Sequence, residues 1–139
     1  MNITTRIIPS VIGLSGLMLA SLGVAGGAAG ASAAAPATCE LTVHSNKALE
    51  LQDNDGTDEI YFKLGSEKTP LRVYSEGQKR RNIGSEFFQN SIDVKVFERD
   101  GNNVTLVGTL NNIPCQNEPG EQDDVAGAGA LNRIRWSVD

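Results

Sequence analysis

Histidine and cysteine are nearly missing from this chain of 139 residues, which has one histidine, His44, and two cysteines, Cys39 and Cys115. A Ser-His-Asp or Cys-His nucleophilic site would have to use His44, and neither cysteine has the sequence setting of a nucleophile. Zinc sites with several His or Cys ligands are excluded if the cysteines are paired. A hydrolase built on two carboxylates needs neither residue type, but no feature of the sequence marks one. We therefore expect no enzymatic activity, and we expect His44 to be a surface residue at a strand end.

Basic and aromatic residues are also few. The chain has 12 Lys and Arg against 17 Asp and Glu, a net charge of −5, and only 5% aromatic residues. Nucleic-acid binding needs a basic footprint, so we expect no nucleic-acid partner. The one basic run is Lys79-Arg80-Arg81. It is either a contact for an anionic lipid or polymer or a solvated strand end.

A long uncharged run is found only at the beginning of the chain. After Arg6, residues 7–33 carry no charge, and the run changes from large apolar residues to Gly, Ala and Ser. Ala31-Ser32-Ala33 fits the small-x-small rule for cleavage, so residues 1–33 are predicted to be a signal peptide, followed by a short tether at 34–38. The alternative is a retained membrane anchor, because the run is long enough to span a bilayer. The leader resembles those of Gram-positive bacteria with GC-rich genomes, which implies a small secreted bacterial protein.

An exported chain with an even number of cysteines favours a disulfide, here between Cys39 and Cys115. On the chain-entropy account such a bridge could contribute up to about 4.5 kcal/mol. The alternative is two free thiols.

Apolar residues alternate with polar ones in several short segments. The clearest is 91–99, where Ile92, Val94 and Val96 share one face, and Asp100-Gly101-Asn102-Asn103 follows as a hairpin turn. No segment shows sustained helical periodicity. The pattern predicts an all-β fold, an antiparallel sandwich of seven to eight strands in a single domain at 39–139.

Residues 111–130 interrupt this pattern. The segment holds two prolines, four acidic residues and several glycines. We expect a long irregular loop here.

Three aspartates, Asp53, Asp55 and Asp58, surround Gly56 just before an alternating strand at 59–64. An EF-hand is excluded, because no register supplies the bidentate Glu at its last position and a strand follows instead of a helix. A second acidic loop, Glu98-Arg99-Asp100, ends the 91–99 strand. Calcium takes six to eight oxygen ligands, which two converging loops can supply. The alternative is a solvated turn, because Asp, Asn and Gly are also ordinary turn formers.

The segment from Leu49 to Tyr61 resembles the first calcium loop of C2 domains, in which two aspartates flank a glycine-containing turn before a strand that opens with an aromatic residue. The segment Val96-Phe97-Glu98-Arg99-Asp100, followed by Leu106-Val107-Gly108, is similar to their third calcium loop. The resemblance covers residues 41–110.

This sequence departs from the C2 pattern at three places. The first loop is one residue short, so that Asp53 or Gln52 fills the first ligand position. Glu98 replaces an expected aspartate, and Thr105 stands where a later one is expected. The resemblance therefore implies an incomplete, weak calcium site.

The resemblance implies a C2-like β-sandwich that binds calcium as its cofactor. The implied ligands are Asp53, Asp58, Glu98 and Asp100, with Asp55 secondary.

We expect a secreted, monomeric, non-enzymatic module that contacts a protein, a cell surface or a membrane. The alternative is a secreted inhibitor or toxin-like effector that binds no metal and uses the 111–130 loop as its contact surface.

Overall fold

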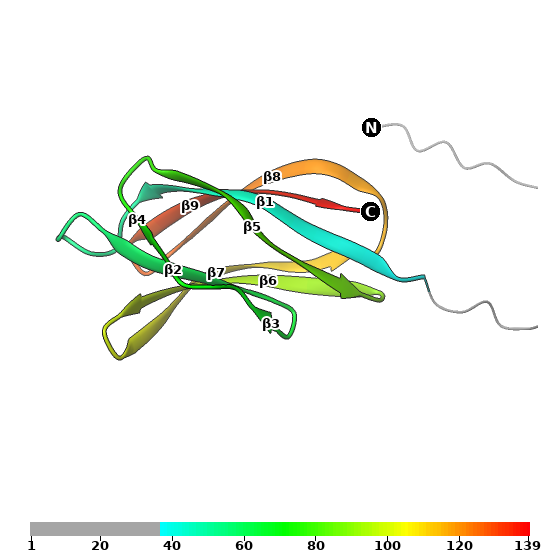
Figure 1. Ribbon diagram of the computed structural model, residues 1–139, viewed down its shortest axis with the longest axis horizontal. Coiled ribbons are helices and arrows are strands. Elements are labelled where there is room, and N and C mark those ends of the chain that lie inside the picture. Colours follow the sequence, from blue (N-terminus) through cyan, green and yellow to red (C-terminus); the bar gives the residue numbers. More distant parts are fainter. Residues whose placement is uncertain (1–36) are drawn as a thin grey trace, which may run out of the picture. The chain divides into compact units, whose positions relative to one another are not determined.

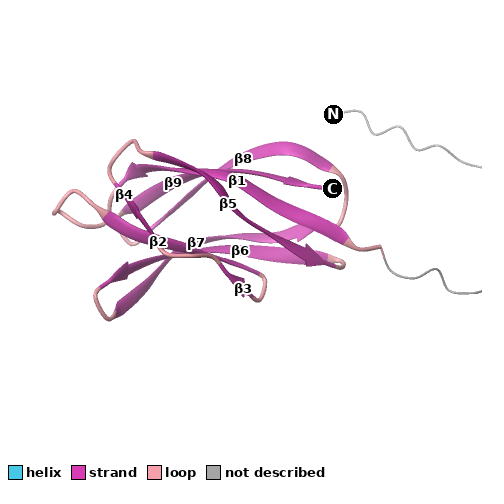
Figure 2. Cartoon of the chain, in the orientation of Figure 1, coloured by secondary structure: helices cyan, strands magenta, loops and turns pink. Residues whose placement is uncertain are grey.

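The computed structural model describes residues 37–139, which belong to one compact unit, Ala34–Asp139. The predicted signal peptide at 1–33 and most of the predicted tether lie outside the described residues. Strands and turns make up the described part of the chain (Figure 2). No helix within residues 37–139 is long and apolar enough to cross a membrane.

Two antiparallel sheets form the fold (Figure 1). The first sheet has the order β5 (Lys79–Phe88), β1 (Cys39–Glu50), β9 (Ala130–Val138) and β8 (Glu118–Gly127). The second sheet is built on β2 (Asp58–Leu64), β6 (Ser91–Asp100) and β7 (Asn103–Pro114), and two short strands, β3 (Glu67–Lys68) and β4 (Arg72–Tyr74), also pair with β2. The predicted antiparallel sandwich is confirmed. The structure has nine strands instead of seven to eight, and two of them, β3 and β4, are only two and three residues long.

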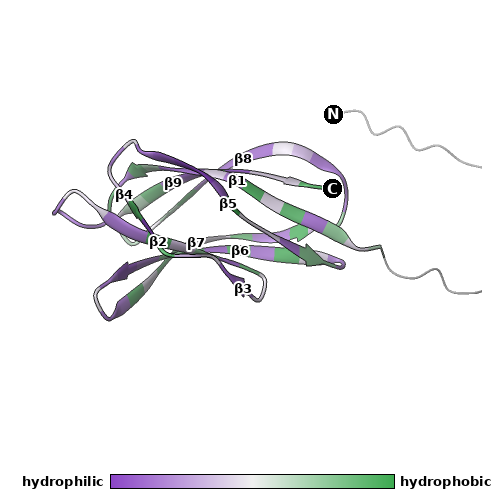
Figure 3. Cartoon of the chain, in the orientation of Figure 1, coloured by the Kyte–Doolittle hydropathy of each residue, from purple (hydrophilic) through white to green (hydrophobic). Residues whose placement is uncertain are grey.

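The core lies between the two sheets and follows the two-residue alternation of the sequence. Ile92, Val94 and Val96 of β6 are buried together, as the pattern predicts. Figure 3 shows apolar residues recurring along the paired strands, while the connecting turns are hydrophilic. The buried apolar residues contributed by β1, β2 and β9 are Cys39, Leu41, Val43, Ala48, Ile60, Tyr61, Phe62, Leu64, Ala130, Ile134, Trp136 and Val138.

Strand β1 continues through the segment where alternation breaks down. Its register with both neighbours shifts between Val43 and Ser45. Against β9 the extra residue is His44 of β1, which forms a β-bulge, whereas against β5 the extra residue lies on β5, between Arg81 and Gly84. A bulge adds one residue to a strand and redirects the side chains on either side of it. His44 is therefore an exposed residue inside a strand, and its predicted place at a strand end is wrong.

The prediction of a long irregular loop at 111–130 is also wrong. Strand β7 runs on to Pro114, and Glu118–Gly127 forms β8, which pairs with β9 at the edge of the first sheet. Only Val125 of β8 is buried, so this strand has no apolar alternation to reveal it. Its main-chain hydrogen bonds to β9 define it, and acidic residues and Pro119 are typical of edge strands. The alternative of an effector that binds through an irregular loop at 111–130 therefore lacks the loop on which it depended.

A disulfide joins Cys39, at the start of β1, to Cys115, just after β7. The S–S distance is 2.04 Å and the two Cα atoms are 5.4 Å apart. The predicted pairing is confirmed, and the bridge ties the first sheet to the second.

Candidate functional site

Asp58 closes the acidic loop between β1 and β2. It is the first residue of β2 and is only 1% exposed. Its carboxylate accepts hydrogen bonds from the backbone N–H of Gln52, at 2.9 and 3.1 Å to its two oxygens, and from that of Asp53 at 3.1 Å. The chain turns back at Gly56, whose φ of +90° favours glycine. Asp58 therefore stabilises the loop through these hydrogen bonds, which use part of the capacity of its carboxylate to accept hydrogen bonds or bind a cation.

Asp55 has a local role at the exposed tip of this loop. Its Oδ1 accepts hydrogen bonds from the backbone N–H of Thr57 at 2.9 Å and from the Thr57 hydroxyl at 3.3 Å. This is the pattern by which an aspartate stabilises a turn.

Glu98 is a carboxylate inside the core. The alternation that buries Ile92, Val94 and Val96 continues to Glu98, which is 0% exposed. Neither of its carboxylate oxygens has a hydrogen-bond partner among residues 37–139. A buried charge without a partner is costly, and such a group is relieved by taking up a proton or by pairing with a cation.

The surroundings of Glu98 favour the protonated, uncharged form of its carboxyl group. Burial, followed by the negative charges of Asp53, Asp58 and Asp100, raises the pKa of Glu98 to about 7. Proton binding and cation binding therefore compete for this carboxylate near neutral pH.

The acidic loop and the β6–β7 hairpin lie at the same end of the sandwich (Figure 1). The pKa of Asp53 is raised by desolvation and then by the charges of Asp100 and Asp58, which shows that residues from both loops act on one another. We call Asp53, Asp58, Glu98 and Asp100 the acidic end. The structure thus places the four main predicted ligand residues at one end of the sandwich.

The side chains of the acidic end do not converge on a single point. Within residues 37–139, no three His, Cys, Asp or Glu side chains are placed so that they could hold a metal ion. The register explains the spacing. Ile60 stands opposite Glu98, so Asp58 on β2 is a diagonal neighbour of Glu98, at roughly 7–8 Å between such positions. The chemical type of these donors suits calcium, because they are carboxylate oxygens and those of Glu98 have no hydrogen-bond partner among the described residues, although their spacing does not yet form a site.

Sequence reasoning missed two features. The burial of Glu98 was signalled by the alternation in 91–99, but the residue was assigned to a loop. The second feature is a groove of about 380 Å³ on the outer face of the first sheet, lined by His44, Ser45, Lys79, Arg81 and Arg135 among others. No local motif signals it, because its residues come from four strands that only the sheet register brings together.

No protein-family model matches the sequence, and no curated protein matches it either. Similarity is found to solved structures. A structure with two C2 domains of Extended-Synaptotagmin 2 aligns with a TM-score of 0.52 at 12% identity, covering 96% of this chain and 48% of that chain. A structure of CC2D1B aligns with a TM-score of 0.50 at 12% identity, covering 74% of this chain and 55% of that chain. CC2D1B is described as coordinating ESRCT-III activity during the mitotic reformation of the nuclear envelope. A structure titled as that of a C2 domain has a TM-score of 0.44 at 12% identity, covering 73% and 97%.

This chain spans about half the length of the first two of these chains. At 12% identity the likeness concerns the fold alone. Together with the two antiparallel sheets, it shows that this protein is a C2-like β-sandwich.

Proposed function

We propose that this protein is a secreted, non-enzymatic module that binds calcium weakly at its acidic end and contacts a protein or a cell surface. The ion would be held by Asp53, Asp58, Glu98 and Asp100, with Asp55 in a secondary role. Carboxylates are hard oxygen ligands, which calcium accepts in flexible geometry.

The buried carboxylate of Glu98 carries this proposal. A solvated acidic turn has no reason to include a fully buried glutamate with two unpartnered oxygens. Four further carboxylates, those of Asp53, Asp58, Asp100 and Glu59, act on Glu98 and raise its pKa, and a divalent cation relieves both the burial and the repulsion. The side chains must draw together to share an ion, which supports weak binding of the kind known for extracellular modules, at about 10⁻⁴–10⁻³ M.

A role without catalysis is supported by the surroundings of the single histidine. The Nε2 atom of His44 lies 2.8 Å from the Ser137 hydroxyl oxygen. In the described part of the chain no carboxylate hydrogen-bonds to this imidazole, so the pair lacks the third group that orients a catalytic histidine.

Thermal unfolding with and without calcium tests the proposal. At ten times the dissociation constant, binding contributes about 1.4 kcal/mol. For a domain of this size the midpoint should rise by roughly 5–10 °C. Magnesium should have less effect, because it demands a tighter octahedral shell and loses its water reluctantly.

Asp100→Asn should abolish most of the calcium-dependent shift. Glu67→Gln is the matched control, because it removes one exposed carboxylate on β3, away from the acidic end, and should keep the full shift. An unchanged midpoint in millimolar calcium would mean that the acidic residues form only a solvated turn.

A further inference from the structure

The outer face of the first sheet gathers positive charge from three strands. Ser45 of β1 pairs with Arg81 of β5 on one side and with Arg135 of β9 on the other. Two residues along β1, Lys47 pairs in the same way with Lys79 and Arg133. Five cationic side chains therefore come from two neighbouring rows of the sheet, in a chain whose acidic residues outnumber its basic ones.

Four of these cations form no salt bridge within residues 37–139. The one salt bridge in that part of the chain is that of Arg133 with Asp124, at 2.7 Å. Lys47 and Lys79 stand directly opposite each other, and like charges in that position destabilise a sheet. Folding alone gives no reason for this arrangement, whereas an anionic ligand would neutralise it.

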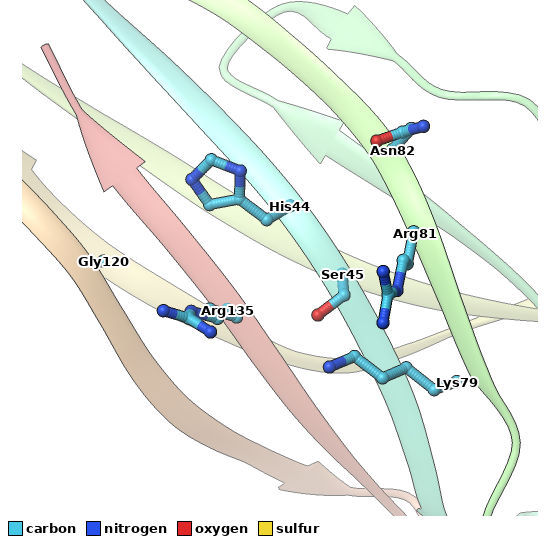
Figure 4. Close-up of a pocket in the computed structure, with 7 residues that line it drawn as sticks. All are labelled: His44, Ser45, Lys79, Arg81, Asn82, Gly120 and Arg135. Carbon is cyan, nitrogen blue, oxygen red and sulfur yellow. The ribbon is translucent and has the colours of Figure 1, made fainter.

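The basic groove, formed by His44, Ser45, Lys79, Arg81 and Arg135, lies where the register of β1 shifts against both of its neighbours. Figure 4 shows Ser45 between Arg81 and Lys79 on one side and Arg135 on the other. Ser45 is only 4% exposed, so it forms the floor, and the long cationic side chains form the walls.

The Arg81 wall is fixed by its own main chain. The Arg72 guanidinium donates hydrogen bonds to the carbonyl oxygens of Arg81 and Asn82, at 2.8 and 2.7 Å. Asn82 has a positive φ of 54°, at the point where β5 changes register against β1. The strand on this side of the groove is therefore held in place by side-chain contacts as well as by the sheet.

Gly120 of β8 lies beside the Arg135 wall. A Cβ atom at Gly120 would meet a terminal guanidinium nitrogen of Arg135 at 3.6 Å, an ordinary contact distance, so the space there does not require glycine. The φ of +82° at Gly120 does favour glycine.

We propose that the basic groove binds a phosphate or sulfate group, a tetrahedral oxyanion. Arg81 and Arg135 stand on either side of Ser45, about 10 Å apart at their Cα atoms, so that both long side chains reach a group above the Ser45 hydroxyl. Guanidinium groups bind such oxyanions through two parallel hydrogen bonds, and lysine adds a point charge. A volume of about 380 Å³ suits one phosphorylated or sulfated group and its nearest atoms.

Titration of the protein with inorganic phosphate and with glycerol 3-phosphate tests this proposal. The titrations are made in a calcium chelator, at constant ionic strength set with sodium chloride. We expect saturable binding, weakened about tenfold or more by Arg81→Gln and by Arg135→Gln, because each removes a charge-assisted contact. Lys63→Gln is the matched control, because it removes an exposed charge from β2 in the other sheet and should leave the affinity unchanged.

Lys79→Gln separates a binding role from a structural one. Removing this charge relieves the repulsion by Lys47, so the variant should bind phosphate more weakly while its thermal midpoint rises. A variant that loses both stability and phosphate binding would contradict the proposal, because Lys79 would then support the fold.

A second arm identifies the source of the oxyanion. Co-sedimentation with phosphatidylcholine vesicles that contain phosphatidic acid presents the same monoester on a lipid. Binding to both probes supports a site that accepts a headgroup, and binding to the soluble esters alone supports a soluble ligand. The proposal is overturned if phosphate binds no better than chloride, if only vesicles bind, or if Lys63→Gln weakens binding as much as Arg81→Gln does.

Discussion

Substituting Glu98 by glutamine should make the protein more stable at alkaline pH when calcium is withheld. The pKa of Glu98 is raised from 4.5 to about 7, chiefly by burial and then by the charges of Asp53 and Asp58. The folded protein therefore holds the Glu98 proton more tightly than the unfolded chain does. This contribution to stability is complete below pH 4.5 and is lost as the pH rises through 7.

The size of the effect follows from the difference between the two pKa values. A difference of roughly 2.5 pH units corresponds to about 3 kcal/mol between the protonated and ionised forms. The Glu98 side chain is 0% exposed, but it lies at the end of the sandwich, where nearby solvent screens part of this penalty. Glutamine cannot ionise, and at pH 8 in a chelator Glu98→Gln should unfold at a midpoint roughly 10 °C or more above that of the unmodified protein.

Thermal or urea unfolding between pH 5 and pH 8 measures this difference. The unmodified protein should lose stability across that range relative to Glu98→Gln, and the two should become similar near pH 5. Glu67→Gln, which changes an exposed carboxylate, should follow the unmodified protein. Parallel pH profiles for Glu98→Gln and the unmodified protein would refute the reasoning, since they would mean that the Glu98 charge is compensated in the folded state.

Three further predictions concern the disulfide, the cleavage of the leader and the contact between β7 and β8. Reduction of the Cys39–Cys115 bridge, which spans 76 residues, should lower stability by up to about 4.5 kcal/mol, seen as a lower urea midpoint after reduction and alkylation. Protein recovered from culture medium should begin near Ala34, and N-terminal sequencing that finds Met1 in the exported protein would contradict cleavage. Gly127→Ala should destabilise by about 1–3 kcal/mol in urea unfolding, because the added Cβ would collide with the main-chain carbonyl oxygen of Val107; an unchanged midpoint would show that β7 and β8 can separate freely.

Much of the fold could be predicted from the sequence, because most strands bury one face against the opposite sheet. Alternation located the strands at 59–64, 91–99 and 131–138, and the structure has strands at Asp58–Leu64, Ser91–Asp100 and Ala130–Val138. The signal failed where burial does not depend on alternation. The edge strand β8 buries almost no side chains, and β1 crosses a bulge that shifts its pattern by one residue.

The candidate site was only partly predictable for the same reason. Composition and order located the two acidic segments, and the structure places them at one end of the sandwich, although Glu98 and Asp100 belong to β6 and not to a loop. Composition could not show that Glu98 points into the core, since its burial follows from the register of β6 with β2. The basic groove lay beyond sequence reasoning altogether, because Ser45, Arg81 and Arg135 become neighbours only through strand pairing.

Calorimetric calcium titration at two pH values tests the calcium site most directly, because it measures binding and the state of Glu98 together. Titrations in buffers of different ionisation enthalpy count the protons that calcium displaces. With a pKa of about 7, Glu98 should release about 0.9 proton per calcium ion at pH 6 and about 0.1 at pH 8, with one ion bound and tighter binding at the higher pH. Glu98→Gln should abolish the pH-dependent proton release and weaken binding. The absence of saturable heat, or equal proton release at both pH values, would contradict calcium binding at the acidic end.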